Sequence, residues 1–179
     1  MNYFQYDKIA NQYDSFFCDE ESLSENDEVA AMLSDVKGKV YDLGCGTGLL
    51  TEIIEIQPDD YRGVDPSGEM LNKFIEKHPE YFKQIIKSTF ENDNCSLVQF
   101  DWVISLFGSI SYVKPKYLKR ISKDAKHYFL MFYKEDYHPV TYTLANVNFD
   151  HYIHRVENLQ SIFEQSTIRE FNNYIIVSK

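Results

Sequence analysis

The sequence predicts an α/β fold in which a mostly parallel sheet ends in an antiparallel hairpin. Three observations lead to this prediction. Short apolar runs alternate with amphipathic helical segments between residues 39 and 133, a glycine-rich turn follows the first run, and two short runs near the end of the chain flank an Asn-Asn pair. Alternating strands and helices are typical of a parallel sheet with helices on both faces. With the two hairpin strands, we expect a seven-stranded sheet preceded by N-terminal helices.

The first part of the chain is expected to be helical. Apolar and aromatic residues recur there at three- and four-residue steps, at Tyr6, Ile9, Ala10, Tyr13 and Phe17. Ser24, with Asp27 three residues later, resembles a capping box and predicts the start of a second helix. Its apolar face contains Val29, Met32, Leu33 and Val36.

The middle of the chain contains five expected strands, at 39–43, 61–65, 82–87, 100–106 and 127–133. Helices are expected between them. One spans Leu49 to Ile54 and ends before Pro58, one is opened by Pro66-Ser67 and stopped by Pro79, and one begins near Pro115. A further helix is expected over 156–163. The last two strands, 167–171 and 174–178, are joined by Asn172-Asn173, and Asn tolerates the positive φ of a tight turn.

Size and composition limit the classes of protein to which this chain can belong. A chain of 179 residues with 44% hydrophobic residues suits one domain with its own core. No apolar run approaches the roughly 20 residues that span a bilayer, and the N-terminus does not resemble a signal peptide. Three scattered cysteines form neither a metal-binding spacing nor a disulfide framework. The net charge of −10 argues against a nucleic-acid partner. We therefore expect a cytoplasmic protein with no membrane or nucleic-acid partner and no metal.

Three of the seven glycines lie at positions 44, 46 and 48, between an expected strand and an expected helix. Glycines there allow a sharp turn and a close approach of a ligand to the backbone, with a helix N-terminus behind it. A simple turn needs fewer glycines. The spacing therefore predicts a nucleotide-binding loop.

Two acidic residues narrow the choice of ligand. Asp42 precedes the loop, where a carboxylate would repel a pyrophosphate but suits an ammonium or sulfonium group. Asp65 ends the second strand, where a carboxylate can accept hydrogen bonds from both hydroxyls of a ribose. The third glycine of the dinucleotide fingerprint Gly-x-Gly-x-x-Gly comes early here, and no P-loop lysine follows. Asp65 alone would fit NAD equally well. The carboxylate of Asp42 and the early position of Gly48 are the features that argue against NAD as the ligand.

The motifs resemble those of the class I S-adenosylmethionine-dependent methyltransferases. Asp42-Leu43-Gly44-Cys45-Gly46-Thr47-Gly48 is similar to the first motif of that family, and residues 61–71 resemble the second. Residues 6–14 are similar to the N-terminal segment of small-molecule methyltransferases, residues 100–105 to the fourth strand, and the chain end to the closing hairpin. The resemblance implies a Rossmann-like class I methyltransferase sandwich with S-adenosyl-L-methionine as cofactor.

The resemblance also implies a set of cofactor-binding residues. Asp65 would bind the ribose, the residues after it would flank the adenine, and a tyrosine would close over the methionine end. Thr89 stands where the family often has an acid. The implied residues are Tyr13, Asp42, Gly44, Cys45, Gly46, Gly48, Asp65, Pro66, Met70, Thr89, Phe90 and Leu106. Cys45 is expected to be a small packing residue rather than a reactive thiol.

The same resemblance divides the single domain 1–179 into four parts. We expect an N-terminal helical cap at 1–37, a cofactor-binding core at 38–135, a substrate lid at 136–155, and a closing helix and hairpin at 156–179. Histidines and tyrosines of the lid region are candidates for contact with the substrate, namely Tyr133, Tyr137, His138, Tyr142, His151, Tyr152 and His154. Tyr112, just past the fourth strand, is the first substrate-side residue to test. Methyl transfer needs positioning more than acid–base chemistry, so no catalytic residue is assigned.

The leading hypothesis is methyl transfer to a small molecule or a peptide by in-line displacement. Two alternatives stay open. The chain could be a non-catalytic, cofactor-binding partner subunit, or, less in keeping with the glycine spacing, a nicotinamide-dependent oxidoreductase. The sequence does not indicate an oligomeric state.

Overall fold

Seven strands form one sheet in the computed structural model, which describes residues 4–137 and 151–179. The strands are β1 (Val40–Leu43), β2 (Tyr61–Asp65), β3 (Ile85–Lys87), β4 (Trp102–Ser105), β5 (His127–Tyr133), β6 (Thr167–Phe171) and β7 (Tyr174–Ser178). Their order across the sheet is β3-β2-β1-β4-β5-β7-β6. The first five strands pair in parallel, and β7 pairs antiparallel with both β5 and β6. The Rossmann-like fold with a closing hairpin is confirmed.

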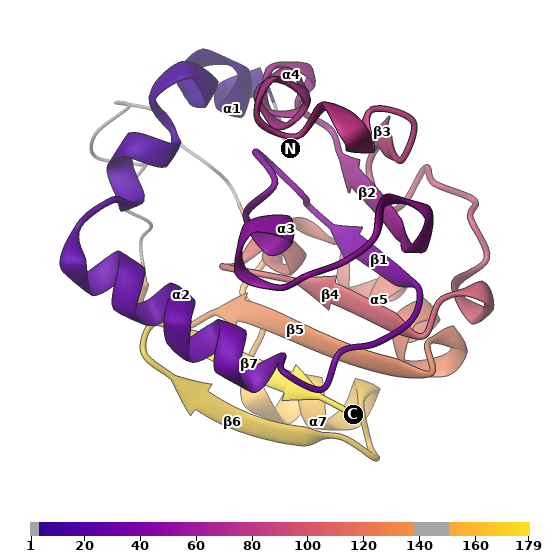
Figure 1. Ribbon diagram of the computed structural model, residues 1–179. Coiled ribbons are helices and arrows are strands. Elements are labelled where there is room, and N and C mark those ends of the chain that lie inside the picture. Colours follow the sequence, from indigo (N-terminus) through magenta and orange to yellow (C-terminus); the bar gives the residue numbers. More distant parts are fainter. Residues whose placement is uncertain (1–3, 138–150) are drawn as a thin grey trace.

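Helices cover both faces of the sheet. They are α1 (Phe4–Ile9), α2 (Glu20–Met32), α3 (Leu49–Ile53), α4 (Gly68–Lys77), α5 (Pro115–Asp124) and α7 (Val156–Ile162), with short 3₁₀ turns η1 (Ala10–Gln12), η2 (Asp14–Phe17), η3 (Pro58–Asp60), η4 (Pro79–Tyr81), η5 (Leu97–Gln99) and η6 (Ser109–Tyr112). Figure 1 shows α2 and α3 in front of the sheet and α5 and α7 behind it. The N-terminal turns arch from α4 to α2 at the upper left of that view.

The core has two halves, one on each face of the sheet. Alternate residues of β5 supply both, with Tyr128, Leu130 and Phe132 on one face and Phe129, Met131 and Tyr133 on the other. The first half packs against Leu118 of α5 and Leu159 of α7. The second packs against Val29 of α2, Leu50 of α3 and Phe74 of α4. A central strand buried on both faces explains why 127–133 is a continuous apolar run.

The hairpin at the chain end is built as the sequence predicts. Asn172 has φ 46°, a left-handed conformation that asparagine tolerates better than most residues. The strands on either side have the bounds expected from the pattern, and so do β2 and β5. The third strand is shorter than expected, because Phe82 lies in the turn after η4 and is 62% exposed.

Two expectations about the N-terminal helices are wrong. The single helix expected over residues 6–17 is broken into α1, η1 and η2. The second helix begins at Glu20 rather than near Ser24, since Asp19 is the N-cap and its Oδ1 accepts a hydrogen bond from the Ser22 N–H at 2.8 Å. An earlier acid with extended backbone thus takes the capping role.

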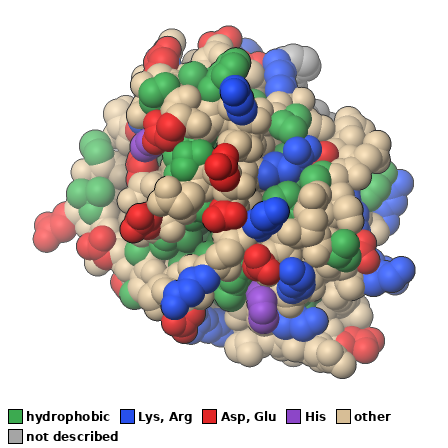
Figure 2. All heavy atoms as spheres, turned by 45° about the vertical axis from the view of Figure 1, so that its right-hand side comes forward, with side chains coloured by type: hydrophobic (Ala, Val, Ile, Leu, Met, Phe, Trp, Pro, Cys, Tyr) green, Lys and Arg blue, Asp and Glu red, His purple; other side chains and the backbone are tan. Residues whose placement is uncertain are grey.

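No helix in the described part of the chain is long and apolar enough to cross a bilayer. On the face seen in Figure 2, acidic and basic side chains are interspersed. Most of the expected lid, including His138 and Tyr142, lies outside the described residues.

Candidate functional site

The glycine loop connects β1 to α3 at the carboxyl edge of the sheet. Gly44 has φ 76°, and a Cβ there would overlap the Ser109 side chain. Gly46 has φ 53° and faces a hollow, since a Cβ there would touch only the Met70 Cε, at 3.4 Å. The Gly44 N–H donates to the Val64 carbonyl at 2.8 Å and fixes the loop on β2. The positive φ therefore favours glycine at both positions, and lack of space requires it at Gly44 as well.

Asp65 ends β2 and is hydrogen-bonded to the loop. Its Oδ2 accepts from the Gly46 N–H at 3.1 Å, and its Oδ1 accepts from the Ser67 N–H at 2.8 Å. Ser67 in turn caps α4, because its Oγ accepts from the Met70 N–H. Burial raises the pKa of Asp65 to about 6. The two backbone hydrogen bonds lower the pKa, but the effect of burial is larger. The carboxylate is held in one orientation and retains free lone pairs.

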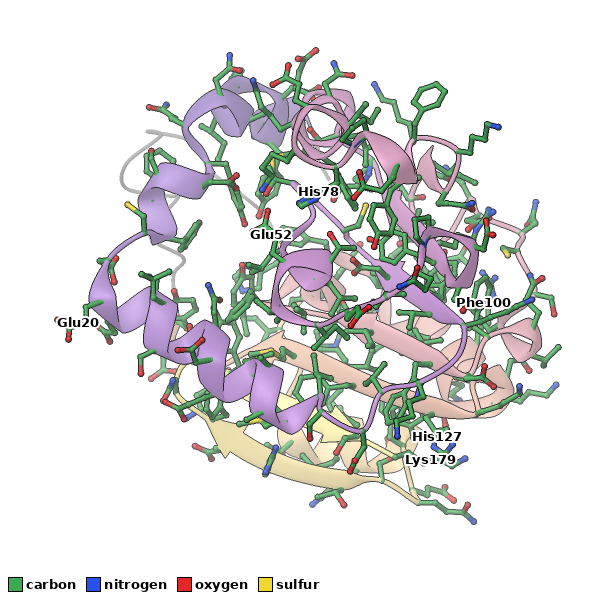
Figure 3. All side chains as sticks on the ribbon, in the orientation of Figure 1. Glu20, Glu52, His78, Phe100, His127 and Lys179 are labelled. Carbon is green, nitrogen blue, oxygen red and sulfur yellow. The ribbon has the colours of Figure 1, made fainter. Side chains whose placement is uncertain are left out.

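The N-terminal segment is fastened across this edge. Asp7 Oδ1 accepts hydrogen bonds from the Ser67 Oγ at 2.6 Å and the Glu69 N–H at 3.1 Å. Farther along, the Thr47 hydroxyl donates to Asp14 at 2.6 Å, and Lys77 of α4 pairs with Asp14. Lys77 also pairs with Glu52, which contacts His78, and Figure 3 shows Glu52 and His78 close together beside α3. These contacts place Tyr6 and Tyr13 over the loop.

A pocket of about 80 Å³ lies between the loop and the N-terminal segment. Eight residues predicted to bind a cofactor line it, namely Tyr13, Gly44, Gly46, Asp65, Pro66, Met70, Thr89 and Phe90. The Tyr6 and Tyr112 hydroxyls, on two walls of the pocket, are hydrogen-bonded at 3.0 Å. A ligand the size of adenosine therefore requires the walls to move apart.

Four other predicted residues lie outside that lining. Asp42 is buried and accepts a hydrogen bond from the Tyr61 hydroxyl at 2.7 Å, and burial raises its pKa to about 7. Cys45 is buried, which raises the pKa of its thiol and keeps it protonated. Gly48 is the N-cap of α3, and Leu106 is buried just past β4. A role for these four in binding stays a prediction.

Several lining residues were not singled out from the sequence, namely Leu43, Val64, Ser88, Glu91, Phe107, Ser109 and Val113. Phe107 is the most informative, because it has φ 46°, a strained value for a phenylalanine. The next residue, Gly108, is also left-handed and packs directly against the Tyr133 ring. Left-handed residues at the end of β4 turn Phe107 toward the pocket, and strain of this kind is common at functional sites.

A second cavity, of about 550 Å³, adjoins the first. The two share Tyr6, Tyr13 and Phe107 as lining residues. Tyrosines form one wall, where the Tyr133 ring centroid lies 5.5 Å from that of Tyr137 and 5.8 Å from that of Tyr174. The opposite side is made by the N-terminal turns and α2, with the acids Asp14, Asp19, Glu21 and Glu25.

The described histidines of the expected lid do not line either cavity. The His151 ring lies 5.2 Å from Tyr133 and 6.2 Å from Tyr112, centroid to centroid. His154 is buried against Phe132, and burial lowers its pKa to about 4, so it is neutral at physiological pH. The Tyr152 ring packs near it. Tyr112 does line the first pocket.

Comparisons with known proteins agree with this geometry. Residues 40–128 match the family model described as a methyltransferase domain. No curated protein matches the sequence.

Several solved structures with the same fold are methyltransferases. One is a possible histamine N-methyltransferase from Thermotoga maritima, 15% identical, with 99% of this chain and 98% of that chain covered and a TM-score of 0.70. A methyltransferase from Clostridium acetobutylicum is 18% identical, with 98% and 97% covered and a TM-score of 0.60. An amino pentose methyltransferase from Micromonospora echinaspora, solved with S-adenosylmethionine bound, is 14% identical, with 87% and 89% covered and a TM-score of 0.64. At these identities the likeness shows the fold.

The matched segment begins at β1 and contains the glycine loop, Asp65 and the strands that carry them. The structural likeness extends over nearly the whole chain, including the closing hairpin. The chain belongs to the class I S-adenosylmethionine-dependent methyltransferase family.

Proposed function

We propose that this methyltransferase transfers the methyl group of S-adenosylmethionine to a small-molecule acceptor bound in the larger cavity. The observation that carries the proposal is the junction of the two cavities at Tyr6, Tyr13 and Phe107. The smaller pocket contains the glycine loop and Asp65, and the larger one lies directly beside it. Two ligands bound on either side of this junction would meet there.

The residues of the smaller pocket suit the cofactor. Asp65 already accepts two backbone hydrogen bonds, but a carboxylate has about four lone-pair sites. Its remaining sites can accept the ribose hydroxyls. The open side of Gly46 leaves room for a ligand against the backbone. Thr89 and Phe90 would flank the adenine, and Tyr13 would cover the methionine end.

The cofactor, when bound, supplies a methyl group on a sulfonium, so the C–S electron pair returns to sulfur as a lone pair of the acceptor forms the new bond. The protein has to align the acceptor and exclude water. Tyr13 is half-buried between the two cavities, and desolvation raises the pKa of its hydroxyl well above the usual range. Tyr13 therefore stays neutral and can close the junction without adding charge.

The form of the larger cavity favours a small molecule over a peptide. Its volume of about 550 Å³ lies within the range of small-molecule sites. About half of its lining residues are aromatic or apolar, and the other half are polar or charged groups that can orient a small ligand. Two of the structural neighbours are named for small acceptors, a possible histamine N-methyltransferase and an amino pentose methyltransferase. We also propose a cytoplasmic setting, which suits the free thiols of Cys18, Cys45 and Cys95.

The test is an isotope-transfer experiment. The protein is incubated with S-adenosylmethionine carrying a trideuterated methyl group, together with either a small-molecule cell extract or a tryptic peptide mixture. Mass spectrometry should find the labelled methyl group in the small-molecule fraction and not with the Gly46→Val variant. Label in the peptides alone would make the acceptor a peptide. Label in neither fraction, from a protein that binds the cofactor, would favour the non-catalytic partner subunit.

A further inference from the structure

The larger cavity contains a carboxylate that no described cation balances. Glu25 lies on α2, is partly buried and lines this cavity. Its Oε1 accepts a hydrogen bond from the Asn172 Nδ2 at 2.8 Å. Within residues 4–137 and 151–179, no lysine, arginine or histidine forms an ion pair with it.

Three other acids of the cavity are already neutralised or used, and a fourth, Glu21, is exposed to solvent. Asp14 and Glu52 share Lys77, at 2.8 Å and 2.7 Å. Asp19 caps α2 through the Ser22 N–H. Glu25 differs from these three, since its only described polar partner is a neutral amide.

The surroundings of Glu25 make an unbalanced negative charge unfavourable. Burial raises the pKa of Glu25 against the hydrogen bond from Asn172, and repulsion from Glu21 and Glu28 on the same helix raises it further. The groups that face it from other elements, Tyr137 and Tyr174, are neutral phenols whose own pKa values are raised by burial. A cation beside Glu25 would relieve the repulsion and the cost of burial together.

The tyrosine wall supplies the second half of a cation site. The Tyr137 and Tyr174 ring centroids are 6.0 Å apart, and both rings lie near enough to Glu25 to be affected by its charge. Aromatic faces attract ammonium and related cations. One carboxylate and a set of tyrosine rings on a shared cavity thus fit a protonated nitrogen.

We propose that the acceptor is a small amine with two functional ends, a protonated nitrogen that binds Glu25 against the tyrosine wall and a separate neutral nucleophile that reaches the junction of the two cavities. The proposal rests on the proposed function, because it names the acceptor of the same site. Glu25 lines the larger cavity and is absent from the lining of the cofactor pocket. A protonated nitrogen has no lone pair, so the atom that receives the methyl group must be another atom of the molecule. An arylalkylamine or a diamine has this form.

The electron balance needs no further reagent. The lone pair of the neutral nucleophile forms the new bond to carbon, and the C–S electrons remain on sulfur. Any proton on the methylated atom passes to water, while the anchoring ammonium keeps its own proton. Glu25 is a positioning residue in this scheme, and it takes up no proton.

The test compares matched ligands that differ in the anchoring group alone. Isothermal titration calorimetry is performed on the protein saturated with S-adenosylhomocysteine. The probes are tyramine against 4-(2-hydroxyethyl)phenol, and histamine against 4-(2-hydroxyethyl)imidazole. At least one amine should bind about tenfold or more tightly than its alcohol partner, the usual strength of a charge-assisted hydrogen bond.

Two variants identify the anchor. Glu25→Gln keeps an oxygen for Asn172 and removes the charge, so the amine preference should fall to within about twofold. Asp27→Asn, at an exposed residue of the same helix that does not line the cavity, should leave the preference unchanged. Both variants should bind S-adenosylhomocysteine as the wild type does.

The outcomes separate the two proposals. If the wild type fails to bind S-adenosylhomocysteine, the proposed function is wrong. If it binds the cofactor product but no amine probe, or binds the alcohols equally well, the amine anchor is wrong and methyl transfer still stands. If Glu25→Gln weakens binding of S-adenosylhomocysteine instead, Glu25 serves the cofactor and the inference is overturned.

Discussion

The cofactor pocket and the acceptor cavity lie side by side, yet the chain builds them in different ways. The central contact of the cofactor pocket, from Gly46 to Asp65, joins residues 19 positions apart. The contact that holds Glu25 in the acceptor cavity joins it to Asn172, 147 positions away. One βαβ unit is enough to form the first contact, while the second requires the complete sheet and its hairpin. The central contact of the proposed donor site is therefore encoded locally, and that of the proposed acceptor site by the whole fold.

The two regions also differ in how their acids are held. Asp65 is fixed by two backbone N–H groups at the end of a strand. Glu25 is partly buried and has one side-chain partner on a turn. The carboxylate on the cofactor side is thus fixed in orientation before any ligand arrives, whereas the one on the acceptor side keeps a charge to be balanced. Each prediction below tests one side of this comparison, with the effects on binding first and the effects on stability after them, each from the largest to the smallest.

Replacing Gly46 with valine should abolish cofactor binding. The residue has φ 53°, which a β-branched side chain rarely adopts, and the added methyl groups would fill the pocket beside Met70. We expect at least a hundredfold loss of affinity for S-adenosylhomocysteine, roughly the affinity equivalent of 3 kcal/mol, measured by calorimetry.

Gly68→Ala is the matched control. A Cβ at Gly68 meets only the flexible end of Lys87, so this variant should bind normally. Circular dichroism should show that both variants are folded. Normal binding by Gly46→Val would mean that the loop is a turn and not a ligand site.

Replacing Asp65 with alanine should weaken cofactor binding by about 2–3 kcal/mol, because charge-assisted hydrogen bonds to a ribose are lost. The same titration with S-adenosylhomocysteine measures this loss. Asp59→Ala, an exposed acid of η3 outside both cavities, should change the affinity little. An unchanged dissociation constant for Asp65→Ala would show that the ribose lies elsewhere.

Replacing Asp42 with asparagine should stabilise the protein at high pH. The pKa of Asp42 is about 7 in the folded chain, against 3.8 as the ordinary value, so between these pH values the native state binds the extra proton. Ionisation of wild-type Asp42 therefore lowers the free energy of unfolding as pH rises. Asparagine does not ionise, so it removes this loss, and its side-chain oxygen can still accept the hydrogen bond from the Tyr61 hydroxyl. The gain over the wild type should be on the order of 4 kcal/mol at pH 8 and less than about 1 kcal/mol at pH 4.

Urea unfolding at the two pH values measures this difference. His154, whose pKa is lowered to about 4, makes the free energy of unfolding fall as the pH decreases, which is the opposite of the Asp42 effect. This contribution is the same in both proteins, so it cancels when the variant is compared with the wild type. A gain of equal size at both pH values would show that Asp42 is ionised throughout.

Replacing Asn172 with alanine should have the smallest effect, a loss of about 1 kcal/mol in the free energy of unfolding. The residue has φ 46°, which alanine adopts less readily than asparagine. Asn172→Gly loses the same hydrogen bond to Glu25 but accepts the conformation, so it should be the more stable of the two. Equal stability of the two variants would show that the conformation of the turn does not matter. Neither variant should alter cofactor affinity, since Asn172 lies on the acceptor side.

The local motifs explain how much could be predicted from the sequence. Positions 44, 46 and 65 follow from strand, turn and helix signals within one segment, and the structure places all three at one pocket. The hairpin around Asn172 is equally local.

Features that depend on distant contacts were missed. The left-handed backbone of Phe107 follows from packing of Gly108 against Tyr133, and no local pattern signals it. Glu25 appears in the sequence as one of several acids near a helix start. Its role becomes visible when the hairpin brings Asn172 beside it. The start of α2 was misplaced for a different reason, since Asp19 and Ser24 are both good caps and the chain uses the first.

The most direct test of the central claim is calorimetry on the wild-type protein with S-adenosylhomocysteine and, in parallel, with NAD. The glycine loop, Asp65 and Tyr13 together predict saturable one-to-one binding of S-adenosylhomocysteine and no measurable binding of NAD. Tight binding of NAD with none of S-adenosylhomocysteine would contradict the account.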